Sequence, residues 1–109
     1  MIEALWSIEF IANTGDFGAG VVVFESGRLF GGDSGYFYVG NYRISAGILT
    51  AEVIVNHYSG PFNSVFGSLT KFTLSLSGQV NQNTFDVIGT TKEFPGNIYC
   101  RLTHRSELP

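Results

Sequence analysis

The 109-residue sequence predicts a single all-β domain, and three observations carry that prediction. Short segments alternate hydrophobic and polar side chains with a period of two, which is the spacing of a strand with one buried face. Clusters of Gly, Asn, Ser, Asp and Pro, the residue types that form tight turns, separate these segments. No segment of the sequence repeats hydrophobic residues at helical spacing over three turns. We therefore expect antiparallel strands joined by hairpins.

Eight segments fit the alternating pattern. It is clearest in 71–77, where Phe72, Leu74 and Leu76 alternate with lysine and hydroxyl side chains. Between segments, Ser26 and Gly27 have the length and composition of a two-residue turn. Residues 59–69 are expected to form a loop or a short helical turn over one end of the fold. The expected strands are residues 6–10, 18–24, 28–30, 36–42, 48–58, 71–77, 85–89 and 98–103, and the other turns are 13–16, 31–35, 45–47, 81–83 and 95–97.

Eight short strands in sequence leave two architectures open, a sandwich with exposed edges and a closed barrel without edges. We favour the eight-stranded antiparallel up-and-down β-barrel, because tight turns pair each strand with the next. The interior of such a barrel is either filled by side chains or holds one small ligand. Because several aromatic residues compete for this space, we expect a filled interior. The side chains expected to line it, and to contact any ligand there, are Ile8, Phe10, Tyr38, Phe72, Leu74 and Phe85.

Composition and charge exclude several classes of function. Six basic and nine acidic residues give a net charge of −3, so the broad positive surface needed for direct DNA or RNA binding is not expected. The single Cys100 cannot form an intramolecular disulfide, which favours a reducing compartment. The N-terminus lacks the pattern of a signal peptide, and no stretch reaches the roughly 18 apolar residues of a membrane-spanning helix. We expect a cytoplasmic protein without a membrane contact.

Several expected strands are hydrophobic on both faces. Residues 21–24 form an unbroken apolar run, and Phe37 and Val39 lie on the face opposite to Tyr36 and Tyr38. A small barrel has no second layer to cover its outer face, and large exposed apolar patches usually mark an interface. The pattern therefore predicts a homodimer.

The order of several short motifs is similar to that of the GrlR family of type III secretion repressors. The motifs are Trp6-Ser7-Ile8-Glu9-Phe10, Gly18 with Gly20-Val21, Gly31-Gly32-Asp33, Tyr38-Val39-Gly40 and the segment 53–58. The resemblance spans most of the chain, and Gly-Gly-Asp followed by Tyr and Gly is its most specific part. It implies a lipocalin-like (calycin-like) barrel, a dimer, and a non-enzymatic regulatory role in which the barrel binds and silences a DNA-binding transcriptional activator.

One loop departs from the family pattern. In GrlR, consecutive acidic residues in the loop after the strand matched here by 36–42 contact the activator. The expected loop here runs from Arg43 through Ile44 and Ser45 to Gly47, carries no acidic residue, and has a local positive charge at Arg43. Arg43, Ile44 and Ser45 are the candidate partner-binding residues, but the same electrostatic contact cannot form. The alternative function is a lipocalin-like carrier of a small hydrophobic ligand, held in the barrel or at the dimer interface.

The glycine-rich motif has a structural interpretation. Gly31 and Gly32 are expected to take the positive φ of a bulge or corner, and Asp33 is expected to accept backbone N–H groups in an Asx-turn. Gly40 is expected to let its strand coil sharply. The alternative for Gly31, Gly32 and Asp33 is a ligand- or partner-binding loop, and we favour the structural interpretation.

Trp6 is the remaining structural candidate. The first and last strands become neighbours in a closed barrel, so Arg101 or Arg105 is expected to lie across the indole. A cation–π contact of this kind contributes about 0.5–2 kcal/mol, depending on its exposure. We therefore expect Trp6 to act in stability and not in binding.

The titratable residues show no catalytic or metal-binding pattern. His57 and His104 have no Ser, Cys or carboxylate at the spacing of a triad. Together with Cys100, which lies on the inward face of its segment, they lack the paired spacing of a zinc site. Glu52 and Asp86 are expected to point outward by strand alternation. We expect no catalytic residue, no metal and no cofactor.

Overall fold

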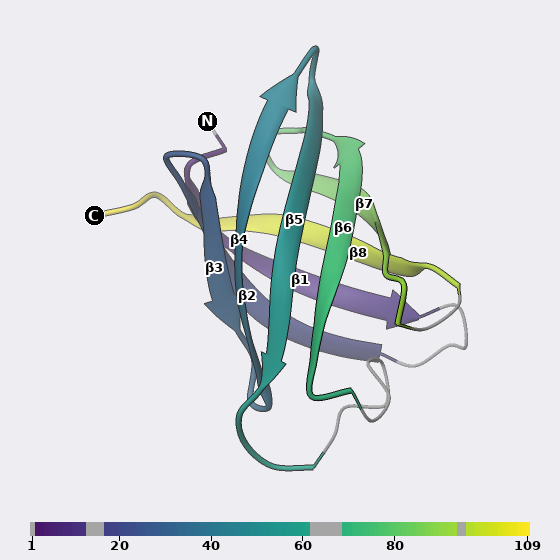
Figure 1. Cartoon of the computed structure of the whole chain (residues 1–109). Helices are drawn as coiled ribbons and strands as arrows, with labels where there is room; N and C mark the ends of the chain where they lie inside the picture. Colours follow the sequence, from purple (N-terminus) through teal and green to yellow (C-terminus); the bar gives the residue numbers. More distant parts are fainter. Residues whose placement is uncertain (1, 13–16, 62–68, 94–95) are drawn as a thin grey trace.

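The computed structural model describes residues 2–12, 17–61, 69–93 and 96–109 (Figure 1). These residues form eight strands, so each expected strand is present, and most extend beyond their expected bounds. In the described part of the chain, no helix has the length and apolar character needed to cross a membrane. The strands are β1 (Ala4–Ala12), β2 (Phe17–Glu25), β3 (Arg28–Gly32), β4 (Tyr36–Ser45), β5 (Ile48–His57), β6 (Lys71–Gln79), β7 (Thr84–Thr90) and β8 (Ile98–Ser106).

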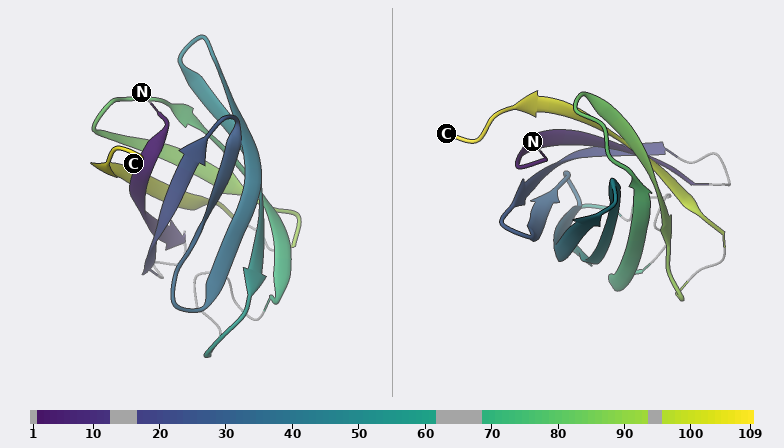
Figure 2. Two further views of the ribbon diagram at one scale, coloured as in Figure 1. Left: turned by 90° about the vertical axis from the view of Figure 1, so that its left-hand side faces the viewer. Right: turned by 90° about the horizontal axis from the view of Figure 1, so that it is seen from above.

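The strands close into an antiparallel up-and-down barrel. Each strand pairs with the next along the chain, and β1 also pairs with β8. Viewed from above, the strands form a ring (Figure 2). The β1–β8 ladder runs from Leu5 opposite Ser106 to Ala12 opposite Ile98, with an irregularity between Leu5 and Trp6. The barrel prediction is confirmed, and the alternative of two facing sheets is excluded.

Because side chains alternate along a strand, each strand places one row of its side chains inside the barrel. Phe72, Leu74 and Leu76 of β6 are buried, whereas the residues between them are exposed, as their spacing predicts. The buried side chains form one continuous core, because each strand contributes its inner row. This core consists of Ala4, Trp6, Ile8, Phe10, Ala12, Val22, Phe24, Leu29, Tyr36, Tyr38, Leu49, Ala51, Val53, Val55, Phe72, Leu74, Leu76, Phe85, Val87, Ile98, Cys100 and Leu102.

Two hairpins end in turns whose central residues both have positive φ. Ser26 and Gly27 have φ values of 51° and 78°, and Ala46 and Gly47 have values of 52° and 79°. Positive φ at both positions is type I′ geometry, whose twist matches that of paired strands. The predicted tight turn at Ser26 and Gly27 is confirmed. The β4–β5 hairpin stays paired up to its turn and projects beyond the neighbouring strands (Figure 1).

The predicted loop at 43–47 is too long, because only residues 46 and 47 form the turn. Arg43, Ile44 and Ser45 belong to β4, where they pair with residues 48–50 of β5. Ala46 adopts a left-handed conformation that is uncommon for a residue with a Cβ atom. This conformation allows two residues to reverse the chain, where a loop of five was expected.

The expectation of positive φ at Gly31 and Gly32 is also wrong. Both residues lie in β3, and neither has positive φ. A Cβ atom on Gly31 would lie 2.0 Å from the carbonyl oxygen of Val21, and one on Gly40 would lie 2.0 Å from that of Glu52. At Gly31 and Gly40 the neighbouring strand lies too close for a side chain, so glycine is needed at both positions.

Three of the expected connections fall wholly or partly outside the described residues. They are the turn at 13–16, residues 62–68 of the expected loop at 59–69, and Pro95 of the turn at 95–97. At the other end, β8 continues to Ser106, three residues beyond the expected strand at 98–103. The extension of β8 places His104 against the barrel wall.

Candidate functional site

The barrel interior is filled by the side chains that were predicted to line it. Ile8, Phe10, Tyr38, Phe72, Leu74 and Phe85 are each at most 4% exposed. The space that the described side chains leave is an apolar cavity of about 20 Å³, which is room for about one water molecule. Pockets for small ligands usually measure about 300–1,000 Å³. As it stands, the interior has no room for an organic ligand.

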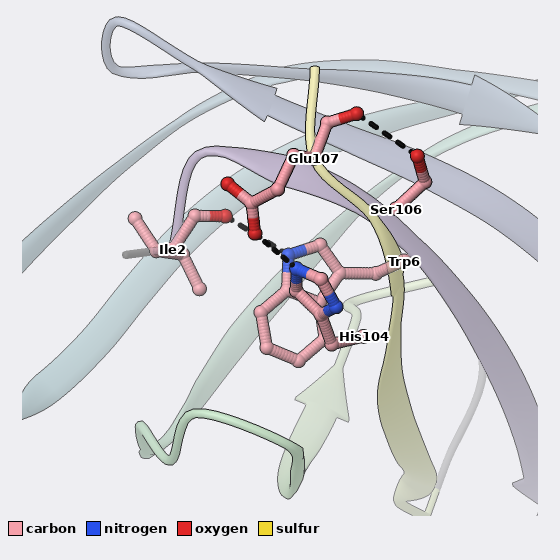
Figure 3. A network of polar contacts seen from close by, with 5 residues as sticks. All are labelled: Ile2, Trp6, His104, Ser106 and Glu107. Carbon is pink, nitrogen blue, oxygen red and sulfur yellow. Dashed lines mark hydrogen bonds and ion pairs between the residues drawn. The ribbon is translucent and has the colours of Figure 1, made fainter.

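Trp6 is completely buried where β1 meets β8. Its indole Nε1 donates a hydrogen bond to the carbonyl oxygen of Ile2 at 2.9 Å. Its ring packs edge-on against Phe85 and His104, at centroid distances of 5.0 Å and 5.4 Å. Figure 3 shows His104 between Trp6 and Glu107, whose Oε2 lies 2.9 Å from Nε2 of His104. This cluster fixes both ends of the chain to the barrel wall.

The predicted contact between Trp6 and an arginine is wrong. Arg101 forms an ion pair with Asp86 on the outer surface, with Nε 2.9 Å from Oδ1, and it lowers the pKa of the Asp86 carboxyl. Nε of Arg105 donates a hydrogen bond to the hydroxyl of a serine in β1 at 2.8 Å. Because side chains alternate along β8, both arginines face outward and His104 meets the inward-facing indole.

Asp33 organises the connection between β3 and β4. Its Oδ1 accepts hydrogen bonds from the backbone N–H groups of Gly35 and Tyr36, each at 2.8 Å, and its Oδ2 accepts one from the Tyr38 hydroxyl. The Asp33 carbonyl oxygen accepts a hydrogen bond from the Tyr58 hydroxyl at 2.7 Å. The expected Asx-turn is therefore present. Burial of the phenol, together with the Asp33 carboxylate, raises the pKa of Tyr38.

The two histidines and the cysteine have unrelated contacts. Nε2 of His57 lies 2.9 Å from the carbonyl oxygen of Gly60, whereas His104 contacts Glu107. Cys100 is buried on the inner face of β8, and burial raises the pKa of its thiol to about 12. Among the described residues, no three His, Cys, Asp or Glu side chains are grouped to hold a metal ion.

The outer wall from β2 to β5 carries a continuous row of hydrophobic side chains. Val23 lies opposite Phe30, Phe30 opposite Val39, and Val39 opposite Ile54. Val39, at the centre of the row, is 51% exposed, and Phe30 and Ile54 are 38% and 40% exposed. We define the β2–β5 face as this row together with the two apolar residues beside it: Val21, Val23, Phe30, Phe37, Val39 and Ile54.

A polar row borders the β2–β5 face. Arg28 lies opposite Asn41 and Asn41 lies opposite Glu52, so the two charges flank β4 on either side. A groove of about 580 Å³ runs over this part of the wall. The Arg28 side chain is 64% exposed and lies 3.6 Å from Glu25, and Oε2 of Glu52 accepts a hydrogen bond from Ser75 at 2.8 Å. Glu52 points outward, as predicted.

A second apolar row lies where β7, β8 and β1 meet. Ile88 is opposite Tyr99, Tyr99 is opposite Ile11, and each is close to half exposed. The adjacent row contains Asp86, Arg101 and Glu9, which together carry a net charge of −1. We define the β8 patch as Ile11, Ile88 and Tyr99.

Strand alternation in the sequence indicates only part of these surfaces. Phe37 and Val39 were expected to face outward, but Arg28, Glu52 and Ile54 were not connected with them. The missing information is the cross-strand register, which the two-residue turns after β2 and β4 set. The former loop candidates 43–45 lie at the projecting hairpin end and belong to neither surface.

Comparisons with known proteins support the fold alone. No protein-family model matches the sequence, and no curated protein matches it. Among solved structures, a redesigned β-barrel is similar to this chain, with a TM-score of 0.51 and 14% sequence identity. The match covers 96% of this chain and 92% of that one. At this identity the likeness shows a shared barrel architecture.

Proposed function

We propose that this chain is a non-enzymatic regulatory protein that binds another protein, as the resemblance to the GrlR family implies, and that the outer wall of its barrel makes the contact. The observation that carries the proposal is the contrast between the two faces of the sheet. The inner face encloses a cavity of only about 20 Å³, whereas Val39 and Tyr99 on the outer face are about half exposed. Exposed apolar patches of a small domain usually mark protein contacts.

We propose a DNA-binding activator as the partner and the β8 patch as its site. Ile11, Ile88 and Tyr99 supply an apolar centre, and the adjacent charged row is net negative. The whole chain carries a net charge of −3. A DNA-binding domain is basic, so it is attracted to such a surface. The 43–47 hairpin end has no acidic residue, and the proposed contact therefore differs from the one that the family uses.

The eight-stranded meander with the last strand beside the first also supports a lipocalin-like assignment. A cytoplasmic location suits this proposal, because a partner that binds DNA is found there and because the single cysteine forms no disulfide. The fold alone does not carry the regulatory role, since one fold can support many functions.

The alternative function is a carrier whose ligand lies outside the barrel. The groove of about 580 Å³ beside Phe30 and Ile54 has the volume of a small-ligand pocket, and in a dimer it would lie at the seam. Native mass spectrometry of the gently purified protein separates the two functions. A copurified apolar molecule favours the carrier, and protein mass alone favours the regulator.

The regulatory proposal is tested by release of an activator from DNA. Helix-turn-helix activators encoded next to the gene are bound to fluorescently labelled promoter DNA, and the chain is added while anisotropy is followed. We expect the chain to release one of these activators. The double variant Ile88→Ala, Tyr99→Ala should require about tenfold or more protein for the same effect, because it removes the apolar centre of the site.

The matched control is Ile44→Ala, which removes an exposed apolar side chain at the hairpin end. This variant should act like the wild type. Unchanged anisotropy with each activator at a large excess of wild-type chain would overturn the regulatory proposal.

A further inference from the structure

We propose that the outer wall over β4, β5, β6 and β7 binds a neutral oligosaccharide in an open groove. These four strands are neighbours in the barrel (Figure 1). The groove over them has a volume of about 880 Å³, which lies in the usual range of about 300–1,000 Å³ for ligand sites. This site is separate from the activator contact and does not depend on the regulatory role.

Cross-strand register arranges the outward side chains of this polar groove in two rows, each four strands wide. The first row consists of Arg43, Thr50, Ser77 and Ile88. The second row consists of Asn41, Glu52, Ser75 and Thr90. Neighbouring strands are about 5 Å apart, and side chains two residues apart on one strand are separated by about 7 Å. A ligand that lies across the strands therefore meets a polar side chain on each of them.

The groups in the polar groove have the hydrogen-bonding chemistry of a sugar ring. The guanidinium of Arg43 only donates hydrogen bonds, the carboxylate of Glu52 only accepts them, and the hydroxyl and amide side chains between them do both. Each hydroxyl of a sugar likewise donates and accepts. Two adjacent sugar hydroxyls can occupy both arms of a guanidinium, a carboxylate or an amide. Because the charges of Arg43 and Glu52 cancel, the groove favours a neutral sugar.

Other classes of ligand fit the polar groove less well. Nucleic acid needs several cations for its phosphates, whereas this groove has no net charge and the whole chain carries −3. An apolar molecule would remove the hydroxyl groups from water without giving them a partner, which is unfavourable. A small zwitterion could bridge Arg43 and Glu52, but it would not reach the hydroxyls of Ser77 and Thr90 on the next two strands.

The charged groups of the polar groove are available to a ligand. The other three arginines each contact a side chain of the barrel, whereas no side chain among the described residues pairs with Arg43. Oε2 of Glu52 accepts a hydrogen bond from the Ser75 hydroxyl at 2.8 Å, which orients this carboxylate. Ile88, where the polar groove meets the β8 patch, is 46% exposed and offers an apolar surface to the C–H groups of a sugar ring.

The test is an NMR titration of the isotope-labelled chain with cellopentaose, maltopentaose, xylopentaose, mannopentaose and chitopentaose. At least one of these should shift the backbone amide signals of residues 41–43, 50–52, 75–77 and 88–90, with a dissociation constant of about 1 mM or lower. Thr50→Val and Thr90→Val keep the shape of the side chain and remove a hydroxyl, so each should raise this constant about fivefold. Arg43→Met should raise it about tenfold, because hydrogen bonds from a charged donor are stronger.

Thr73→Val and Arg28→Met are the matched controls, because they make the same changes at exposed positions that do not line the polar groove. Both should bind the sugar like the wild type. The proposal would be overturned if none of the five sugars shifted these signals at about 10 mM, if the shifts lay elsewhere on the barrel, or if glycerol caused the same shifts. Equal weakening by the controls would also overturn it. A chain that binds the sugar but releases no activator contradicts only the regulatory role.

Discussion

The imidazole of His104 lies edge-on to the indole of Trp6, with ring centroids 5.4 Å apart and the ring planes at 80°. The two residues are paired across the β1–β8 ladder, next to the irregularity between Leu5 and Trp6. A residue of the last strand therefore covers the one tryptophan of the sequence. Closure of the barrel and burial of this indole depend on each other.

Replacement of Trp6 should be among the most destabilising changes in the core. Trp6→Ala should lower the free energy of unfolding by about 3–5 kcal/mol, as truncation of a buried tryptophan usually does. The measurement is urea unfolding followed by circular dichroism. Tyr99→Ala, at a half-exposed position, is the control and should cost less than about 1 kcal/mol. Equal losses for the two variants would contradict the burial described here.

Tyr38 should make the stability of the fold sensitive to alkaline pH. Burial and the neighbouring Asp33 carboxylate raise the pKa of this phenol above its ordinary value of 10.0. Below pH 10 the phenol is protonated in both states, so its contribution to stability is complete. Above pH 10 the unfolded chain loses the proton while the folded chain keeps it, and the free energy of unfolding falls. Urea unfolding between pH 9 and pH 11.5 should show a steeper fall for the wild type than for Tyr38→Phe, and parallel curves would exclude this role.

Two glycine substitutions should lower the free energy of unfolding by different amounts, because the two glycines are needed for different reasons. In Gly40→Ala the new Cβ atom would lie 2.0 Å from the carbonyl oxygen of Glu52, so the loss in unfolding free energy should be about 3 kcal/mol or more. In Gly47→Ala the Cβ atom meets nothing within 4 Å. The strain then comes only from the φ of 79° and should cost about 1–2 kcal/mol. Thermal or urea unfolding of both variants tests this order, and the reverse order would contradict it.

Cys100 should be chemically inert in the folded protein. Burial raises the pKa of its thiol to about 12, so at pH 8 only about one thiol in 10,000 is ionised, and the thiolate is the reactive form. Ellman's reagent at pH 8 should react fully in guanidinium chloride and only at the rate of unfolding without it. Rapid modification of the native chain would show that the thiol is accessible.

Strand alternation predicts much of the fold because the inner and outer faces of this barrel differ in polarity. Residues 71–77 are the clearest case, since each hydrophobic side chain expected to be inside is buried. The six lining candidates were found in the same way. Closure of the ring followed from the tight turns, which leave each strand beside the next.

The candidate surfaces depend on relations that a sequence does not display. Whether Arg28 and Glu52 share a row with Asn41 is decided by the register, and register depends on backbone conformation in the turns. Ala46 takes a positive φ that its residue type disfavours, so the sequence does not indicate the two-residue turn that keeps 43–45 in β4. The prediction of an arginine beside Trp6 is wrong for a simpler reason. Alternation along β8 places Arg101 and Arg105 on the outer face, away from the buried indole.

The β1–β8 ladder, which pairs Ile11 with Tyr99, has a consequence for how this chain reaches its native state. Contacts between such distant segments form slowly, because loop-closure entropy opposes them. Until that ladder forms, β1 and β8 are open edges that can pair with other chains. Dilution during refolding should therefore improve the yield of native protein, even where the finished barrel is stable.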